Sequence, residues 1–261
     1  VLCWYFYGGG SSLFFIHLAA IQYPRHDSFF PYSIHSSLVT CFQCCQLGTC
    51  ASCVFIPTNE CIAIFCWGRQ CIICGDFGFL WDGSSKEIKI LEELGSRKYN
   101  VCFLDGTHEN FDKLYSCRET VWKGGRVHRI TGNLFHMCRG QIFNIDGVKY
   151  FTFGGGESYD KEMRTERRSW WREELPSPVE MEEGVENLEE NNGEVDIILT
   201  HEPPSLIKSS MLMRMGLGDR INKLNGYLEE INRTFKFKQW YFGYMHEDKV
   251  ITPGHIAVFK D

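Results

Sequence analysis

Short apolar runs alternate with amphipathic stretches from residue 70 to the end of the chain. Residues 70–74 and 101–104 are apolar enough to predict two buried strands. Between them, isoleucine and leucine recur at helical spacing over 84–95, which predicts a helix that ends at Gly95. The succession of strand, helix and strand indicates an α/β fold.

The middle of the chain carries the pattern of hairpins. Four short alternating runs predict antiparallel sheet, and Asp146-Gly147 predicts the turn between the last two runs. These runs cover residues 126–130, 134–138, 141–145 and 149–153. Further apolar runs at 195–199 and 238–242 predict buried strands, and residues 250–259 predict a closing hairpin.

Three more helices are predicted after the hairpins. The first covers 158–175 and is rich in arginine, and because glutamates are interspersed we interpret it as a solvated helix face. The second begins with a capping box formed by Ser177 and Glu180, and the third covers 217–232. Residues 70–261 are therefore expected to form an α/β domain of two facing mixed β-sheets flanked by helices.

The first 73 residues differ in composition from the rest of the chain. They contain four charged side chains, no lysine and nine of the 13 cysteines. One interpretation is a membrane or targeting segment, but glycines and serines interrupt its apolar stretch. A second is a zinc site at Cys41, Cys44, Cys50 and Cys53, although the connector between the two cysteine pairs is short. We favour a third, an out-of-frame or non-native sequence.

The composition also constrains the domain organisation and the partners. We divide the chain into an aberrant, Cys-rich and charge-poor segment, 1–69, and a domain, 70–261. The net charge is −6 without a basic surplus, which argues against a dedicated nucleic-acid binder. We expect a cytoplasmic protein that does not bind membranes, and the sequence leaves the oligomeric state open.

Polar side chains follow four of the apolar runs, at Asp76, His108, His201 and His246. Because the carboxyl ends of neighbouring strands meet at one crevice in open α/β sheets, these residues are expected to lie close together. A carboxylate with imidazoles suits borderline divalent metals such as Mn, Fe, Zn or Co. Two such metals can activate a water molecule and neutralise a phosphoryl group.

Four ordered motifs resemble those of calcineurin-like metallophosphoesterases, in particular a small bacterial or phage branch of that family. They are Gly75-Asp76, Gly106-Thr107-His108-Glu109, Thr200-His201 and Gly243-Tyr244-Met245-His246. The resemblance covers about residues 70–261. It implies a four-layer sandwich and a phosphatase-type hydrolase with two divalent metal ions, manganese among the candidates.

The resemblance also implies roles for individual residues. Asp76, His201 and His246 match metal ligands, His108 matches the group that protonates the leaving oxygen, and Glu109 is expected to orient His108.

The sequence departs from the family pattern at three points. Thr107 stands in place of a ligand asparagine, Tyr244 stands in place of a metal-binding histidine, and no D-x-H motif precedes Asp76. The first strand of the family fold is therefore expected to be missing or replaced. We predict a metal-dependent phosphoesterase that is impaired in this copy. The alternatives are a catalytically dead binding protein of the same fold, and a membrane-tethered or Cys-rich interaction protein.

Overall fold

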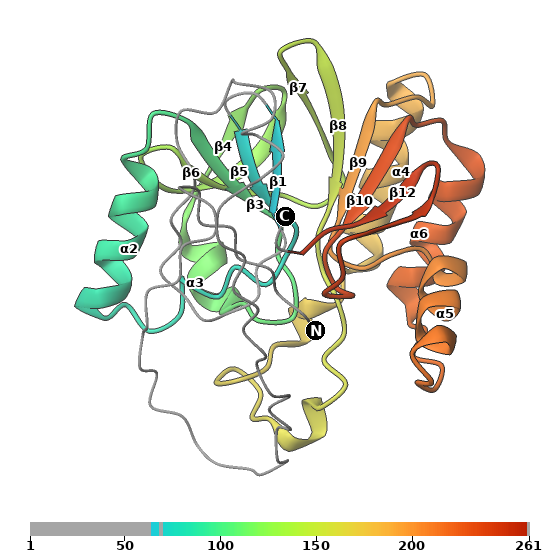
Figure 1. Cartoon of the computed structure of the whole chain (residues 1–261). Helices are drawn as coiled ribbons and strands as arrows, with labels where there is room; N and C mark the ends of the chain where they lie inside the picture. The colour runs from blue at the N-terminus through green and yellow to red at the C-terminus, as the bar shows by residue number, and fades with distance from the viewer. Residues whose placement is uncertain (1–63, 68–69, 260–261) are drawn as a thin grey trace, which may run out of the picture. The chain divides into compact units, whose positions relative to one another are not determined.

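The computed structural model describes residues 64–67 and 70–259, which form two mixed β-sheets with helices on their outer faces (Figure 1). This arrangement confirms the predicted α/β class. The expectations for the N-terminal apolar stretch and for the paired cysteines at 41–53 lie outside the described residues.

The first sheet has six strands in the order β1-β2-β3-β6-β5-β4. The central strands β2, β3 and β6 are parallel, whereas β1, β5 and β4 are antiparallel to their neighbours. The bounds are β1 Ile64–Trp67, β2 Gln70–Ile73, β3 Asn100–Phe103, β4 Arg118–Trp122, β5 Gly125–Thr131 and β6 Leu134–Met137. Strand β1 falls within the segment that the composition sets apart, and it extends the sheet beyond β2.

The second sheet also has six strands, in the order β11-β12-β10-β9-β8-β7. Its bounds are β7 Gln141–Ile145, β8 Val148–Phe153, β9 Ile197–Thr200, β10 Gln239–Phe242, β11 Lys249–Thr252 and β12 His255–Ala257. The predicted hairpins are present, but β5–β6 and β7–β8 belong to different sheets and do not form one antiparallel sheet. The chain crosses between the sheets near Gly140, whose φ of 70° is in the left-handed region.

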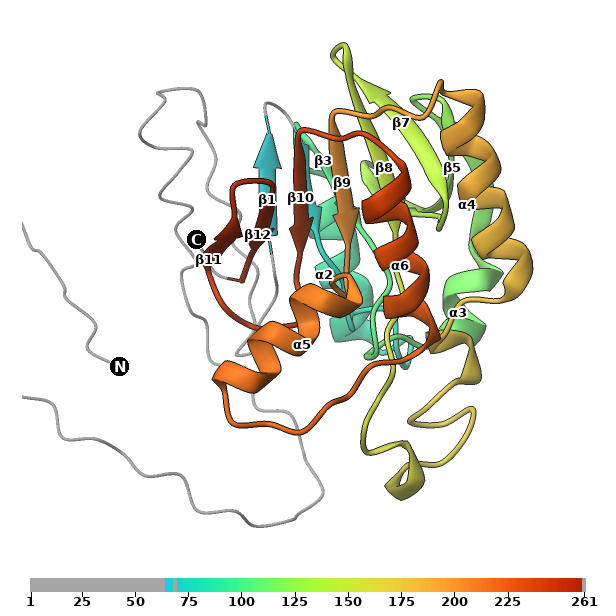
Figure 2. The same ribbon diagram turned by 90° about the vertical axis from the view of Figure 1, so that its right-hand side faces the viewer.

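The inner faces of the two sheets pack against each other. One buried cluster combines Ile72 and Cys102 of the first sheet with Tyr150 and Leu199 of the second. Helices α2 (Ser85–Gly95) and α3 (Phe111–Ser116) cover the outer face of the first sheet. Helices α4 (Pro178–Glu190), α5 (Ser205–Arg214) and α6 (Lys223–Thr234) cover the second (Figures 1 and 2). Each sheet is thus packed on both faces, and the polar residues that follow the strands lie at the ends of these two packed sheets.

Local capping signals explain where the predicted helices begin. The Ser84 side chain caps α2, and Ser177 with Glu180 forms the predicted capping box of α4. Helix α6 begins at Lys223 rather than at 217, because the Asn222 side chain accepts a hydrogen bond from the backbone N–H of Asn225 at 3.0 Å. The sequence patterns did not predict α3, α5 or β4.

The helix predicted over 158–175 is wrong. This segment contains only the short 3-10 turns η1 (Lys161–Met163) and η2 (Arg172–Glu174). Trp171 is buried against the first sheet and donates its indole N–H to Asp112 at 2.9 Å, which fixes the segment from outside. Arg167 has a φ of 58°, which a helix does not allow. Tertiary burial of an aromatic anchor overrides local helix propensity here.

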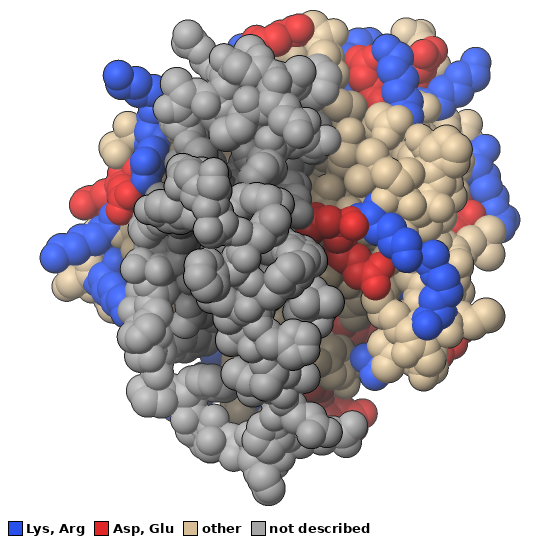
Figure 3. Space-filling model, in the orientation of Figure 1, with Lys and Arg blue, Asp and Glu red and all other residues tan. Residues whose placement is uncertain are grey.

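Charged side chains of both signs are interspersed on the face shown in Figure 3, without a large uniformly basic area among the coloured residues. In the part of the chain that the structure describes, no helix combines the length and apolarity that a membrane span requires.

Candidate functional site

The loops that follow β2, β3 and β9 bring three predicted site residues together. The Nδ1 atom of His108 lies 3.2 Å from Oδ2 of Asp76, and the Nε2 atom of His201 lies 3.5 Å from Oδ1 of Asp76. Asp76 and His108 follow strands of the first sheet, whereas His201 follows a strand of the second. Asp76 is therefore in contact with a residue from each sheet, as expected if the strand ends share one crevice.

Asp76 is held in a strained and strongly polar environment. Its φ of 55° is unusual for a residue with a side chain and marks a functional position in many proteins. Its Oδ1 accepts hydrogen bonds from the backbone N–H groups of Thr107 at 2.6 Å and His108 at 3.1 Å. Burial by itself would raise the pKa of Asp76, but the charges of His201 and His108 and these hydrogen bonds outweigh it and hold the pKa well below its usual range. The carboxylate is therefore ionised at neutral pH.

His201 presents an unsatisfied nitrogen to this carboxylate. Its ring is buried, and Nδ1 lies 2.9 Å from the carbonyl oxygen of Cys74, so that Nδ1 carries the proton and donates it. Nε2 then faces Asp76, and this atom has no hydrogen-bond partner among the described residues. A buried lone pair opposite a carboxylate oxygen is unfavourable unless a cation or proton lies between them. Metal-binding histidines have this arrangement, because their second nitrogen donates to a carbonyl or carboxylate.

Glycines allow the loops to approach these side chains closely. A Cβ atom on Gly75 would lie 2.0 Å from Nδ1 of His201, and one on Gly106 would lie 2.3 Å from Oδ1 of Asp76. Gly75 also has a φ of 95°. The glycines that precede Asp76 and Thr107 are thus required by the packing of the crevice, not only by the turns.

Glu109 has a different contact from the one expected. Its carboxylate accepts hydrogen bonds from the backbone N–H of Phe77 at 2.7 Å and of Gly78 at 3.4 Å. Burial, and then the neighbouring charge of Asp76, raise the pKa of Glu109. These contacts hold the loop after Asp76 in place, and the expected role of Glu109 in orienting His108 stays a prediction.

The loop after β10 contributes an aromatic ring next to His201. Tyr244 packs edge-on against the His201 imidazole with ring centroids 5.5 Å apart, and burial raises the pKa of its phenol. His246 is exposed, has a φ of 50° and stacks on Phe259 with centroids 4.9 Å apart. Within the described residues, Asp76, His201 and His246 do not form a group of ligand atoms within 4.8 Å of one another. The structure thus joins Asp76 with His201 but does not gather His246 with them at this distance.

A buried ion pair that the motifs did not reveal supports His201. Glu202 and Lys208 are both buried, and Lys208 Nζ lies 2.6 Å from Glu202 Oε2. Asn225 donates to the same carboxylate oxygen at 3.1 Å, and Lys208 Nζ lies 4.5 Å from the centre of the Tyr244 ring. This network fixes the loop that presents His201. The sequence shows only a glutamate after the histidine, so a contact to a lysine on α5 could not be anticipated.

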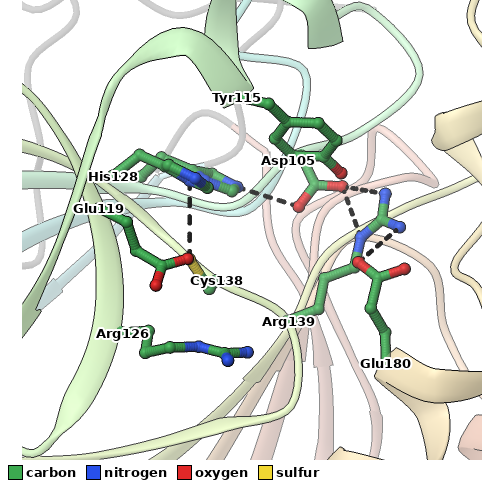
Figure 4. A pocket seen from close by; sticks show the side chains of 9 residues that line it. Asp105, Tyr115, Glu119, Arg126, His128, Cys138, Arg139 and Glu180 are labelled. Carbon is green, nitrogen blue, oxygen red and sulfur yellow. Dashed lines mark hydrogen bonds and ion pairs between the residues drawn. The ribbon is translucent and has the colours of Figure 1, made fainter.

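A second polar cluster surrounds Asp105, which lies two positions after the end of β3 (Figure 4). The sequence motifs did not predict this cluster. Asp105, Arg126 and Glu180 line a pocket of about 250 Å³. Two histidines and a cysteine, His128, His136 and Cys138, lie within it with their ligand atoms no more than 4.8 Å apart. Burial lowers the pKa of His128 to about 4 and raises the pKa of the Cys138 thiol to about 12.

Comparison of the chain with protein-family models and with curated proteins finds no match. The resemblance to metallophosphoesterases therefore rests on the four sequence motifs.

Proposed function

We propose that the chain is a metal-dependent phosphoesterase of the calcineurin-like type, with a four-layer sandwich fold and weak activity. The observation that carries the proposal is the unpartnered Nε2 atom of His201, which faces Oδ1 of an ionised Asp76 at 3.5 Å. The order of the motifs around these two residues supports it further. Phosphate esters are the substrate class that the motifs imply.

The residues in the crevice fit one divalent cation better than two. Asp76 and His201 would hold the first ion, since they supply a carboxylate oxygen and a correctly oriented imidazole nitrogen. When bound, such an ion activates water and neutralises charge on a phosphoryl group. The other donors at this ion are weak, because Thr107 offers a hydroxyl and Tyr244 a protonated phenol, and the motifs leave only Asp76 and His246 for a second ion.

His108 has the position of a proton donor in this proposal. Its side chain is 55% exposed, so that a substrate in the crevice can reach it, and Nδ1 lies 3.2 Å from Asp76 Oδ2. The carboxylate orients the ring, and an imidazolium at this place would donate a proton to a leaving oxygen. Glu109 holds the loop that carries Asp76, and the Glu202–Lys208 pair holds the loop that carries His201.

Binding of a phosphate ester without turnover is the second candidate function. Tyr244 favours it, because its ring packs against His201 at a position where the family pattern has a metal-binding histidine. A protein of this kind would bind one cation and a phosphate ester but would lack the second ion that hydrolysis by a dinuclear centre needs.

Metal-dependent hydrolysis of p-nitrophenyl phosphate and of its diester tests the proposal. With Mn²⁺ we expect weak hydrolysis by the natural chain, loss of it in Asp76→Asn, and no change in a variant of the exposed residue Asp219, Asp219→Asn. The double variant Thr107→Asn, Tyr244→His is expected to hydrolyse faster, because it restores ligands to the ion that His201 would hold. Hydrolysis that persists in Asp76→Asn, or a double variant without any gain, would contradict the enzyme proposal.

A further inference from the structure

Three potential metal ligands lie on one face of the first sheet, away from the Asp76 crevice. His128 of β5 is the direct partner of His136 in β6, and Cys138 follows His136 by two positions. Because side chains alternate along a strand, His136 and Cys138 project from the same face. All three side chains are buried. Strand pairing thus delivers two imidazoles and a thiol to one place.

The distances within this cluster suit a tetrahedral ion. The Nδ1 atoms of His128 and His136 lie 3.0 Å apart, and Sγ of Cys138 lies 3.6 Å from Nδ1 of His128. Zinc bonds of about 2.0 Å to nitrogen and about 2.3 Å to sulfur place tetrahedral ligands about 3.3 Å (N to N) and about 3.5 Å (N to S) apart. Two of the three ligand separations are thus close to those around tetrahedral zinc, and the third is within 4.8 Å.

Neighbouring charges orient the histidine that is central to the cluster. Nε2 of His136 lies 3.0 Å from Oδ1 of Asp105, and the other carboxylate oxygen of Asp105 accepts two hydrogen bonds from Arg139, at 3.0 and 2.5 Å. The proton of His136 therefore resides on Nε2, and the lone pair of Nδ1 points at His128. A carboxylate that holds the distal nitrogen of a histidine is the usual support of a metal ligand.

We propose that His128, His136 and Cys138 bind a zinc ion in a second metal site, whose fourth position faces the pocket. Two imidazoles and a thiolate prefer zinc over magnesium, calcium or manganese. Binding breaks the S–H bond of Cys138, and the proton leaves to solvent while the sulfur electron pair goes to the metal. Glu119, which pairs with His128 across β4 and β5 and lines the pocket, or a water molecule would complete the tetrahedron.

This site does not depend on the proposed phosphoesterase activity, because its ligands differ from those at Asp76. It would connect β5 and β6 through the metal and stabilise the sheet that carries Asp105 and the loop after it. Three protein ligands with an open fourth position are also the composition of zinc sites that bind an exogenous ligand.

Cobalt titration of the full chain tests the proposal, since Co²⁺ replaces zinc and shows a charge-transfer band when bound to a thiolate. The background carries serine in place of Cys41, Cys44, Cys50 and Cys53, so that this N-terminal cysteine group does not contribute. We expect one equivalent of cobalt with a thiolate band, loss of that equivalent in Cys138→Ser, and its retention in Cys117→Ser. Cys117 is a matched control because it is a free, half-buried cysteine outside the cluster.

Two further variants keep the test decisive. His128→Asn is expected to lose the same equivalent, and it covers the case in which Cys138→Ser does not fold. Asp76→Asn is expected to keep the thiolate band, which separates this site from the proposed phosphoesterase centre. A thiolate band of equal intensity in Cys138→Ser and Cys117→Ser, or no thiolate band in the starting chain, would overturn the proposal.

Discussion

The Nε2 atom of His201 lies 3.5 Å from Oδ1 of Asp76, although the two residues follow strands of different sheets. The His201 Nδ1 proton is donated to the Cys74 carbonyl oxygen at 2.9 Å, so Nε2 is the nitrogen that faces the carboxylate. In the proposed function, a divalent cation would lie between these two side chains.

Replacement of His201 by glutamine is expected to weaken Mn²⁺ binding by at least about 10-fold, because it removes a direct nitrogen ligand. Calorimetric titration of Mn²⁺ into the purified chain measures this. His108→Gln is the matched control, since His108 is proposed to donate a proton rather than to hold the metal. It should keep the Mn²⁺ affinity and reduce hydrolysis. Equal Mn²⁺ affinities in natural chain and His201→Gln would exclude this histidine as a ligand.

Replacement of Gly75 by alanine is expected to destabilise the fold more than the same change at Gly147. Both glycines have positive φ, 95° and 83°, so both variants carry a backbone strain of about 1–2 kcal/mol. Only the Gly75 variant also places a methyl group 2.0 Å from the His201 ring, whereas nothing lies within 4 Å at Gly147. Overpacking adds about 1–3 kcal/mol, measured as the difference in free energy of unfolding in urea. If Gly75→Ala and Gly147→Ala lose the same free energy of unfolding, the His201 ring moves away from the added methyl group without an energetic cost.

Lys208→Met is expected to reduce the free energy of unfolding by about 3–5 kcal/mol, because it leaves the Glu202 carboxylate buried without its cation. Lys238→Met is the control, since the Lys238–Asp196 pair is exposed on the lysine side and such pairs contribute about 0–1 kcal/mol. Urea unfolding measures both.

A second change separates charge burial from packing at the same position. Adding Glu202→Gln to Lys208→Met removes the unpaired charge, so part of the lost stability should return. If the double variant is no more stable than Lys208→Met, the loss comes from packing of the lysine stem and not from the charge.

Glu174 is expected to make stability depend on pH. Burial raises the pKa of its carboxyl from 4.5 to about 7 in the folded chain, so between these values the unfolded state binds fewer protons at this group. Its contribution to stability therefore falls as the pH rises from 4.5 to about 7 and is constant above that.

The variant Glu174→Gln lacks this titration and retains an oxygen that can accept the hydrogen bond of Ser158 N–H, which is 3.0 Å long. Its Tm should equal that of the natural chain near pH 4.5 and exceed it at pH 8, by about 2–4 °C for each kcal/mol of stability that the titration removes. The exposed Glu182, changed to glutamine, is the control and should show no such divergence. Parallel pH profiles of Glu174→Gln and the natural chain would rule out a raised pKa at this residue.

Local signals in the sequence determined much of the secondary structure. The serine caps of α2 and α4 act within one helical turn, and the apolar runs that became β2, β3, β9 and β10 reflect burial on both faces. The order of these strands predicted that Asp76, His108, His201 and His246 would lie close together, because strand ends share an edge irrespective of side-chain detail, and the structure joins the first three.

Only the tertiary structure decided the contacts that depend on distant partners. Burial of Trp171 removed a helix that local propensity predicted, and Glu109 turned to backbone N–H groups of the loop after Asp76. The pairing of β5 with β6 set His128 beside His136, a relation that a shift of one residue would abolish. Caps and periodicity are encoded over a few residues, whereas register and the distance between sheets follow from the packing of the whole core. That is why the sequence predicted which strand ends lie close together, and the fold decided which atoms meet.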